Sequence, residues 1–148
     1  MEVRSHCPIN FTLEHFGDKW SFLIIRDLMF KGKRHYNEFL EAGEKVSTSV
    51  LGDRLKKLEE AGIIAQGEDT VKKSRIRYSL TQKGIDLLPI LIEMIVWGGY
   101  KDELTESPKE FLDQATQNRE ALIREIRESL INDHLEGDNQ INSKKNKG

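Results

Sequence analysis

Cysteine is almost absent from this sequence, and its scarcity removes several classes of protein. The single Cys7 cannot form an internal disulfide, and without a CxxC pair there is no cysteine-based zinc site. The four histidines share no metal-ligand spacing, so we predict no metal centre. A chain of 148 residues is nevertheless long enough to bury a core without such cross-links.

Long hydrophobic runs are missing too. The two most apolar stretches, FLII and LLPILIEMIVWGG, are too short or are interrupted by Glu93, so neither is suited to cross a bilayer. The N-terminal residues Met1 to Arg4 lead into no signal-peptide core. We therefore expect a cytoplasmic protein without a membrane partner.

The sequence also lacks the short motifs on which most enzymes depend. It has no phosphate-cradling glycine loop, no GxSxG elbow, and no carboxylate and histidine pair that the expected fold would bring together. We predict that the protein is not an enzyme and holds no cofactor.

Neither sign of charge is in large excess, because the formal net charge is only −2. Basic residues slightly outnumber acidic ones in residues 1–101, whereas acidic residues outnumber basic ones in 102–148. Since a partner meets a local surface and not the total charge, the mildly basic first part leaves nucleic-acid binding open.

What the sequence does contain is a series of helical patterns and one hairpin pattern. Pro89 is expected to bend a helix, Gly98 with Gly99 to end it, and the SPKE sequence from Ser107 to begin the next with a capping box. The expected helices cover residues 10–16, 19–30, 37–42, 47–61, 82–97 and 107–132, and the expected strands cover 63–66 and 75–80. The fold class is therefore mostly α with a small β-hairpin (α+β).

The stretch STSVLGDRLKKLEEAGII, residues 47–64, has the features of a helix with two functions. Ser47 is a natural N-cap and Gly62 a natural C-terminal stop. Leu51, Leu55 and Leu58 fall on one stripe that can pack on a core. The opposite face is polar, with small side chains at its N-terminal end, which leaves it suited to bind a partner.

Two short consecutive helices joined at AGEKVS and followed by a hairpin with a basic tip match a winged helix-turn-helix. In this pattern, residues 47–57 are expected to enter a DNA major groove. We assign residues 1–100 to this DNA-binding domain, 101–132 to a helical dimerisation extension, and 133–148 to a disordered polar tail. The apolar seam from Phe111 to Leu130 is expected to pack against a second chain.

Several short motifs, in their order and spacing, resemble the HxlR-type winged helix-turn-helix transcriptional regulators, which are MarR-like. They are CP at 7–8, GDKW at 17–20, KRHYNEF at 33–39, STSVLGDRLKKLEEAGII at 47–64, YSLTQKG at 78–84, and LLPIL with WG at 87–98. The resemblance implies a homodimer on pseudo-palindromic, double-stranded operator DNA, with N- and C-terminal dimerisation helices. It also implies that residues 47–60 are a recognition helix in the major groove and that residues 67–75 are a wing near the minor groove. Glu68 and Asp69, at the base of the wing, depart from the basic form of the family.

The candidate DNA-binding residues lie on the recognition helix, on the wing and in the turn before the first helix of the motif. They are Lys33, Arg34, Ser47, Thr48, Ser49, Arg54, Lys56, Lys57, Lys72, Lys73 and Arg75. Thr48 and Ser49 suit base edges or phosphates, whereas Arg54 lies to the side and reaches phosphate alone. Two competing interpretations stay open: a solvated helix face, and a winged-helix module that binds protein and not DNA.

Cys7 also has two interpretations. Beside Arg4 and His6 its thiolate would be favoured, and some relatives in the resembled family sense oxidants or electrophiles with a cysteine near this position. Alternatively, Cys7 is a small apolar residue packed at the domain edge. The sequence identifies no small-molecule effector, because the aromatic residues that could line an effector pocket are as well explained by a hydrophobic core.

Overall fold

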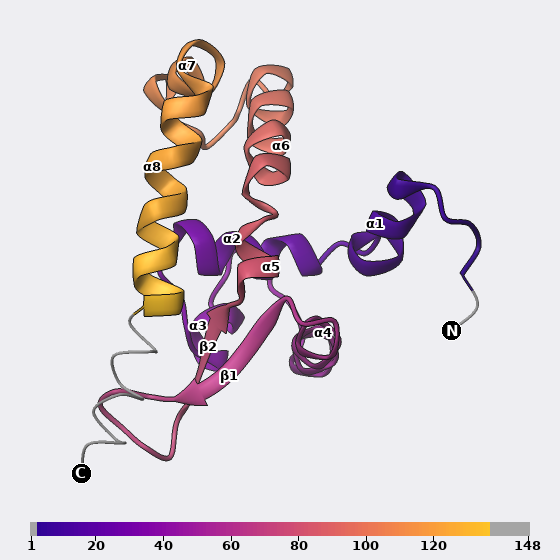
Figure 1. Ribbon diagram of the computed structural model, residues 1–148, viewed down its shortest axis with the longest axis vertical. Coiled ribbons are helices and arrows are strands. Elements are labelled where there is room, and N and C mark those ends of the chain that lie inside the picture. The colour runs from indigo at the N-terminus through magenta and orange to yellow at the C-terminus, as the bar shows by residue number, and fades with distance from the viewer. Residues whose placement is uncertain (1–2, 137–148) are drawn as a thin grey trace. The chain divides into compact units, whose positions relative to one another are not determined.

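The computed structural model describes residues 3–136 and is mostly helical, with one hairpin (Figure 1). The elements are α1 (Pro8–Phe16), α2 (Ser21–Phe30), α3 (Tyr36–Leu40), α4 (Thr48–Glu60), β1 (Ile64–Glu68), β2 (Ile76–Leu80), α5 (Gln82–Ile85), α6 (Leu88–Lys101), α7 (Lys109–Gln117), α8 (Arg119–Ile131) and a π-helical turn (Asn132–Glu136). They form two compact units, which meet in sequence between Thr81 and Gln82. The predicted fold class is confirmed.

In the first unit, Asp18 satisfies the amides at the start of α2. Its Oδ1 accepts from the backbone N–H groups of Trp20 and Ser21 at 2.7 and 2.8 Å, and its Oδ2 accepts from the Ser21 hydroxyl at 2.6 Å. Burial opposes the ionisation of Asp18, but these hydrogen bonds outweigh it and lower the pKa of the carboxyl. Helix α1 begins at Pro8 with Cys7 at the N-cap, so the predicted start at Asn10 was wrong.

Helix α4 is held as its sequence predicts. The Ser47 hydroxyl accepts from the Val50 N–H at 3.3 Å, and Leu51, Leu55 and Leu58 are all buried. Gly62 has φ +74°, and the amide of the next residue bonds back to the Leu58 carbonyl at 2.9 Å. This closing turn needs the left-handed conformation that glycine adopts without strain.

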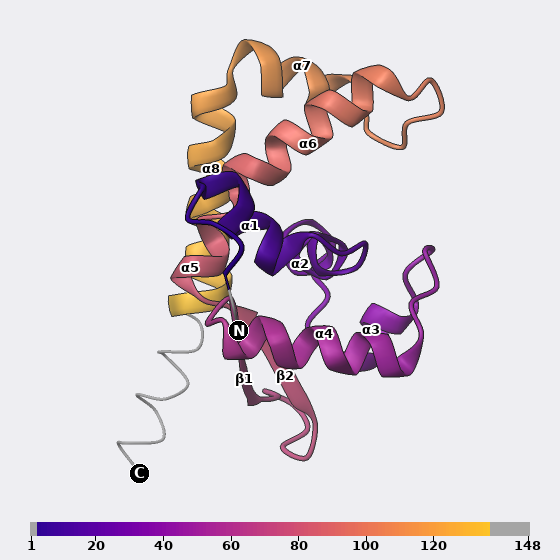
Figure 2. The same ribbon diagram turned by 90° about the vertical axis from the view of Figure 1, so that its right-hand side faces the viewer.

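The hairpin pairs β1 with β2 antiparallel, with Ile64 opposite Leu80 and Glu68 opposite Ile76. Arg34 adds a third partner to it, since the Tyr78 N–H donates to the Arg34 carbonyl at 2.7 Å. Figure 2 shows the hairpin projecting on the side of α4 that faces away from α2. The hairpin thus has the position of a wing beside α4.

The second unit departs from the predicted single helix over residues 82–97. The chain breaks between α5 and α6 at Asp86 and Leu87, and Pro89 lies in the first turn of α6, where its missing N–H leaves no helical bond unmade. The predicted stop at Gly98 and Gly99 was wrong, because α6 continues to Lys101. A Cβ on Gly99 would lie 2.6 Å from Leu112 Cδ2, so this glycine allows α6 and α7 to approach closely.

The predicted helix over 107–132 is two helices, interrupted at Asn118. The predicted capping box was also wrong, since α7 begins at Lys109 with Pro108 at its N-cap and without a side-chain cap. Asn132–Glu136 form a π-helical turn with His134 buried, so the predicted polar tail does not start at 133; residues 137–148 of that tail lie outside the described residues. Between residues 3 and 136, every helix is too short or too polar to cross a membrane.

Candidate nucleic-acid interface

The outer face of α4 begins with three exposed hydroxyl residues, Ser47, Thr48 and Ser49. The Ser47 hydroxyl serves as the cap and lies 3.4 Å from the Ser49 hydroxyl, whereas the Thr48 carbonyl accepts from the Tyr36 hydroxyl at 3.0 Å. Lys56 and Lys57 continue the exposed face towards the C-terminal end. A helix N-terminus with short hydroxyl side chains offers donors both to base edges and to phosphate oxygens.

The turn before α4 is fixed by an ion-pair network that the sequence analysis missed. Arg26 donates from both terminal nitrogens to Glu44, at 2.8 and 2.9 Å, and from Nε to the buried carboxylate of Asp27 at 3.0 Å. The hydrogen bonds from Arg26 lower the pKa of Glu44 to about 2. Lys45 in the same turn has φ 60°, a left-handed conformation that costs energy for a residue with a side chain.

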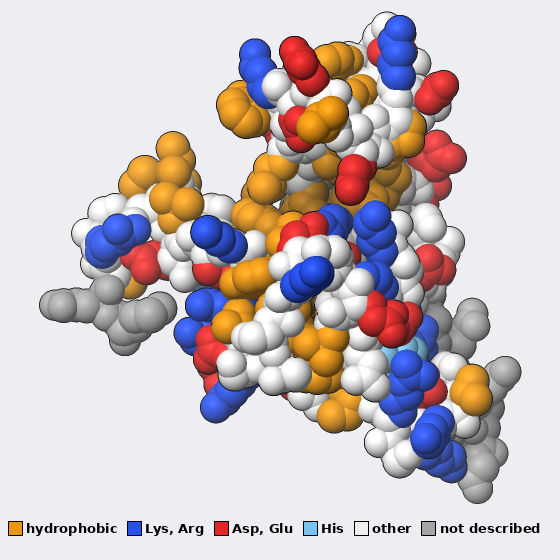
Figure 3. Space-filling model, turned by 180° about the vertical axis from the view of Figure 1, so that it is seen from behind, with side chains coloured by type: hydrophobic (Ala, Val, Ile, Leu, Met, Phe, Trp, Pro, Cys, Tyr) orange, Lys and Arg blue, Asp and Glu red, His pale blue; other side chains and the backbone are white. Residues whose placement is uncertain are grey.

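The wing loop, residues 69–75, carries its positive charges outward. Lys72, Lys73 and Arg75 are exposed, and Figure 3 shows Lys and Arg side chains gathered at this tip of the surface. The Asp69 carboxylate accepts from the Lys72 N–H at 3.0 Å, and the Asp69 N–H donates to the Arg75 carbonyl at 3.1 Å. The acidic residue that departs from the family pattern therefore organises the loop that presents the basic ones.

His35 ties the wing loop to α3. Its Nε2 lies 2.9 Å from Asp69 Oδ1, and its Nδ1 contacts the Glu38 carboxylate. The hydrogen bond with His35 is the largest cause that lowers the pKa of Asp69. For Glu38, burial opposes ionisation, but the hydrogen bond with His35 prevails and lowers that pKa as well. His35 was not among the predicted candidate residues, yet its neighbours make it a link between two acidic groups.

The side chains of Lys33 and Arg34 contact other residues of the first unit. The Arg34 side chain points to the hairpin, where Nε donates to the Tyr78 carbonyl and Nη2 to the Ser79 hydroxyl, both at 2.6 Å. Lys33 is only partly exposed, and its Nζ lies 3.8 Å from an oxygen of Asp27. Because both cations already serve contacts within the unit, we remove them from the candidate DNA-binding set.

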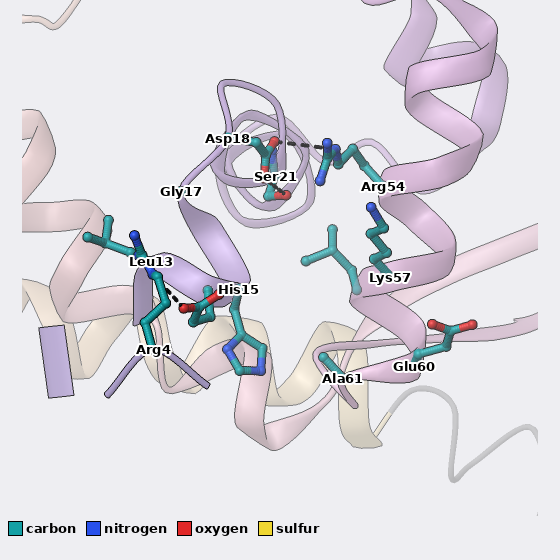
Figure 4. A pocket seen from close by; sticks show the side chains of 12 residues that line it. Arg4, Leu13, His15, Gly17, Asp18, Ser21, Arg54, Lys57, Glu60 and Ala61 are labelled. Atoms are coloured by element: carbon teal, nitrogen blue, oxygen red, sulfur yellow. Dashed lines mark hydrogen bonds and ion pairs between the residues drawn. The ribbon is translucent and has the colours of Figure 1, made fainter. Parts of the chain in front are cut away.

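Arg54 also contacts acidic residues of the first unit, and Figure 4 shows its side chain next to Asp18. Its side chain turns from the outer face of α4 towards the start of α2, where Nε lies 3.6 Å from Asp18 Oδ1 and 3.8 Å from Asp53 Oδ2. Lys57 remains exposed and lies 3.2 Å from the same Asp53 carboxylate. Asp53 thus partly neutralises the middle of the helix, which leaves the N-terminal end of α4 and the wing loop as the candidate interface.

Cys7 is exposed at the N-terminus of α1. The backbone N–H groups of Asn10 and then Ile9 donate to its sulfur and lower the pKa of the thiol. The alternative of a packed apolar side chain does not fit this exposure. Among residues 3–136, no three His, Cys, Asp or Glu side chains gather where they could hold a metal ion.

Comparison with known proteins matches residues 15–106 to the family described as HxlR-like helix-turn-helix. One relative is an uncharacterized HTH-type transcriptional regulator of Synechocystis sp., 40% identical over 88 residues, which are 60% of this chain and 64% of that relative. This chain therefore spans just under two thirds of that relative's length.

Two solved structures have the same fold and similar sequences. The redox regulator HypR in its oxidized form is 31% identical, with a TM-score of 0.58 over 66% of this chain and 100% of its own. The reduced form of the transcriptional regulator YodB from Bacillus subtilis is 28% identical, with a TM-score of 0.54 over 69% of this chain and 100% of its own.

Proposed function

Because the chain belongs to the HxlR-like helix-turn-helix family, whose matched relatives are transcriptional regulators and not enzymes, we propose that it binds operator DNA sequence-specifically as a homodimer. In this proposal α4 enters the major groove, and the wing loop contacts the DNA backbone or the minor groove. Two exposed features of the first unit support this proposal: the hydroxyl residues at the start of α4 and the basic residues at the tip of the wing loop.

The two features have different roles in the proposal. Thr48 and Ser49 lie where a helix N-terminus meets base edges, so they supply sequence preference. Lys72 and Lys73 lie on a loop tip without a packing function, so they supply phosphate contacts that do not depend on sequence. Ser47, Lys56, Lys57 and Arg75 complete the proposed contact set.

Selection of bound sites from random duplex DNA, followed by salt titration of the selected site, tests this division. We expect Ser49→Ala to change the selected sequence, with about 1–3 kcal/mol of discrimination per lost base contact. The double variant Lys72→Ala, Lys73→Ala should lower the affinity for all DNA sequences alike. It should also reduce the salt dependence of that affinity by the amount expected for about two phosphate contacts. An absence of binding to any duplex would overturn the proposal and favour a protein partner.

The dimer proposal rests on apolar residues that the chain leaves uncovered. Helix α6 exposes Met94, Trp97 and Tyr100, and α1 exposes Ile9 and Phe11. An exposed apolar face of this kind marks an interaction surface, and a second copy of the chain offers the same two faces.

The apolar seam from Phe111 to Leu130 was predicted to pack against a second chain, but most of its apolar residues have another position. Leu112, Ala115, Leu122 and Leu130 are buried within one chain. We therefore propose that α7 and α8 support α6, and that α1 and α6 face the partner. Trp97→Asp should give monomers with retained helicity, whereas Leu122→Asp should unfold the second unit. Light scattering together with circular dichroism separates these outcomes, and a native protein that is monomeric at micromolar concentration would refute the dimer.

We also propose that Cys7 makes the regulator responsive to oxidants. The exposed thiol with its lowered pKa supports this proposal, as does the likeness to the redox regulator HypR. In the test, diamide takes two electrons and two protons from a pair of Cys7 thiols, one per protomer, which leaves a disulfide and the reduced hydrazine. Operator affinity should change after diamide in the native protein and stay constant in Cys7→Ser. An equal response of the two proteins would exclude Cys7 as the sensor.

A further inference from the structure

His35 lies between two carboxylates that come from different parts of the first unit. Glu38 of α3 contacts its Nδ1, and Asp69, at the start of the wing loop, has Oδ1 2.9 Å from its Nε2. The side chains of His35 and Asp69 are only 16% and 8% exposed, so solvent has little access to the contact between them. The imidazole ring therefore attaches the wing loop to α3.

A neutral imidazole cannot satisfy both carboxylates. In either tautomer one ring nitrogen carries a hydrogen and the other accepts, whereas an ionised carboxylate only accepts. The pKa of each carboxyl lies below its ordinary value, so Glu38 and Asp69 both stay ionised from about pH 5.5 upward. Only the imidazolium has the two N–H donors that this geometry needs. Loss of the proton leaves the lone pair of one ring nitrogen facing a carboxylate.

The cations near the ring are directed elsewhere. Lys33 lies against Asp27, and Arg34 donates to the second strand of the hairpin. The remaining charged side chains of the hairpin are exposed or half-buried; they are Glu68, Lys72, Lys73, Arg75 and Arg77. Solvent screens the lysines of the loop tip, whereas the two carboxylates favour the charged ring at contact distance. The balance of charge at the ring is thus set by Glu38 and Asp69.

We propose that the protonation of His35 controls the attachment of the wing loop: the imidazolium holds Asp69 against α3, and loss of the proton releases it. Glu38 is three residues away in the same element, so the contact with Asp69, which closes a longer loop, is the one that is lost. The attached state binds one proton more than the released state. Attachment is therefore favoured at low pH and is lost as the pH rises and the imidazole gives up its proton.

Release of the loop has a consequence for DNA. The loop presents Lys72 and Lys73, and a loosened loop distributes these lysines over more positions, which weakens their contacts with phosphate. Operator affinity then falls as the pH rises. This consequence rests on the proposed function, whereas the attachment of the loop does not.

The attachment is tested without DNA by electron paramagnetic resonance of a nitroxide label at Val71→Cys, in a Cys7→Ser chain. Spectra are compared at about pH 5.5 and about pH 8.5, on either side of the range in which imidazoles ordinarily titrate. The rotational correlation time of the label should shorten several-fold at the higher pH. A label at Leu104→Cys should show no such change; Val71 and Leu104 are 91% and 88% exposed, so neither label replaces a packed side chain.

Glu38→Gln is the decisive variant, because its amide can donate to an unprotonated Nδ1 while Nε2–H donates to Asp69. The loop should then stay attached at both pH values. Asp69→Asn supplies a donor from the side of the wing and should remove the pH dependence in the same way. His35→Ala should leave the label mobile at both pH values, whereas His15→Gln, a change at an imidazole of α1, should keep the native response.

Two results would overturn the proposal. One is a label at residue 71 whose mobility in the native background is the same at both pH values. The other is a pH response that persists in both Glu38→Gln and Asp69→Asn, since the proton would then act at another group.

Operator binding at the two pH values tests the consequence for DNA. Affinity should fall several-fold at the higher pH in the native protein and stay nearly constant in Glu38→Gln. A label that responds to pH in a protein that binds no duplex would support the attachment and refute the proposed function alone. A label that responds while native and Glu38→Gln proteins show the same pH dependence of DNA binding would refute the regulatory consequence.

Discussion

Replacing Glu44 by glutamine tests how the turn before α4 is held. The two hydrogen bonds from Arg26 lower the pKa of Glu44 from its ordinary 4.5 to about 2. If solvent did not reach this ion pair, a pKa difference of this size would contribute about 3 kcal/mol to the free energy of unfolding. The Glu44 side chain is 41% exposed, however, so solvent screening reduces the expected contribution to about 1 kcal/mol.

The pH dependence of this contribution follows from the direction of the shift. Because the pKa of Glu44 is lower in the folded chain, its stabilisation is fully present above about pH 4.5 and is lost as the pH falls towards about 2. Glu44→Gln should therefore lower the free energy of unfolding by about 1 kcal/mol near neutral pH and by about half as much near pH 3. Urea denaturation followed by circular dichroism at the two pH values measures both differences.

Glu41→Gln provides the matched control, because Glu41 is an exposed carboxylate at the end of α3, in the same connection. It should change the free energy of unfolding by less than about 0.5 kcal/mol. The reasoning fails if Glu44→Gln is as mild as this control near neutral pH. It also fails if the loss caused by Glu44→Gln is the same at both pH values.

Three further substitutions test other parts of the fold. Gly99→Val should destabilise the second unit by about 1–3 kcal/mol through its clash with Leu112, as a lower thermal midpoint would show. Ser47→Ala should cost about 1 kcal/mol by removing the cap of α4, measurable by urea denaturation, and an unchanged midpoint would contradict the cap. His35→Ala should remove one of the two partners of the Asp69 carboxylate, leaving the Lys72 N–H, and weaken DNA binding several-fold with an unchanged selected site; a changed site would contradict a role confined to the wing.

The features of the fold that could be predicted from sequence are those with a local cause. The Ser47 cap, the leucine stripe of α4 and the stop at Gly62 each depend on neighbours within a few residues, and all three are confirmed. The predictions of single helices over 82–97 and 107–132 were wrong, because helix propensity does not reveal where the chain must change direction between two helices. Gly99 was taken for a stop, yet its role depends on Leu112, which is distant in sequence.

The residues of the candidate site divide in the same way, into those whose position has a local cause and those whose position depends on distant residues. The exposure of Ser49 and of the wing lysines was predictable because small or charged residues on a face or loop tip need no long-range partner. Arg34 and Arg54 were not, because a long cationic side chain has the same sequence pattern whether it reaches solvent or folds inward to a carbonyl or carboxylate. Their partners, Tyr78 and Asp18, are separated from them by dozens of residues.

The bond between Arg34 and Tyr78 has a consequence for the order in which the protein folds. The hairpin closes a short loop and can form within microseconds, whereas its bond to Arg34 must close a loop of 44 residues that contains all of α3 and α4. The chain loses conformational entropy when this loop closes, before the contact contributes any stabilisation. The hairpin should thus form early as a loosely attached ribbon and become fixed only when the helices between have folded. A ribosome must accordingly release the chain through β2 before α4 gains its final support.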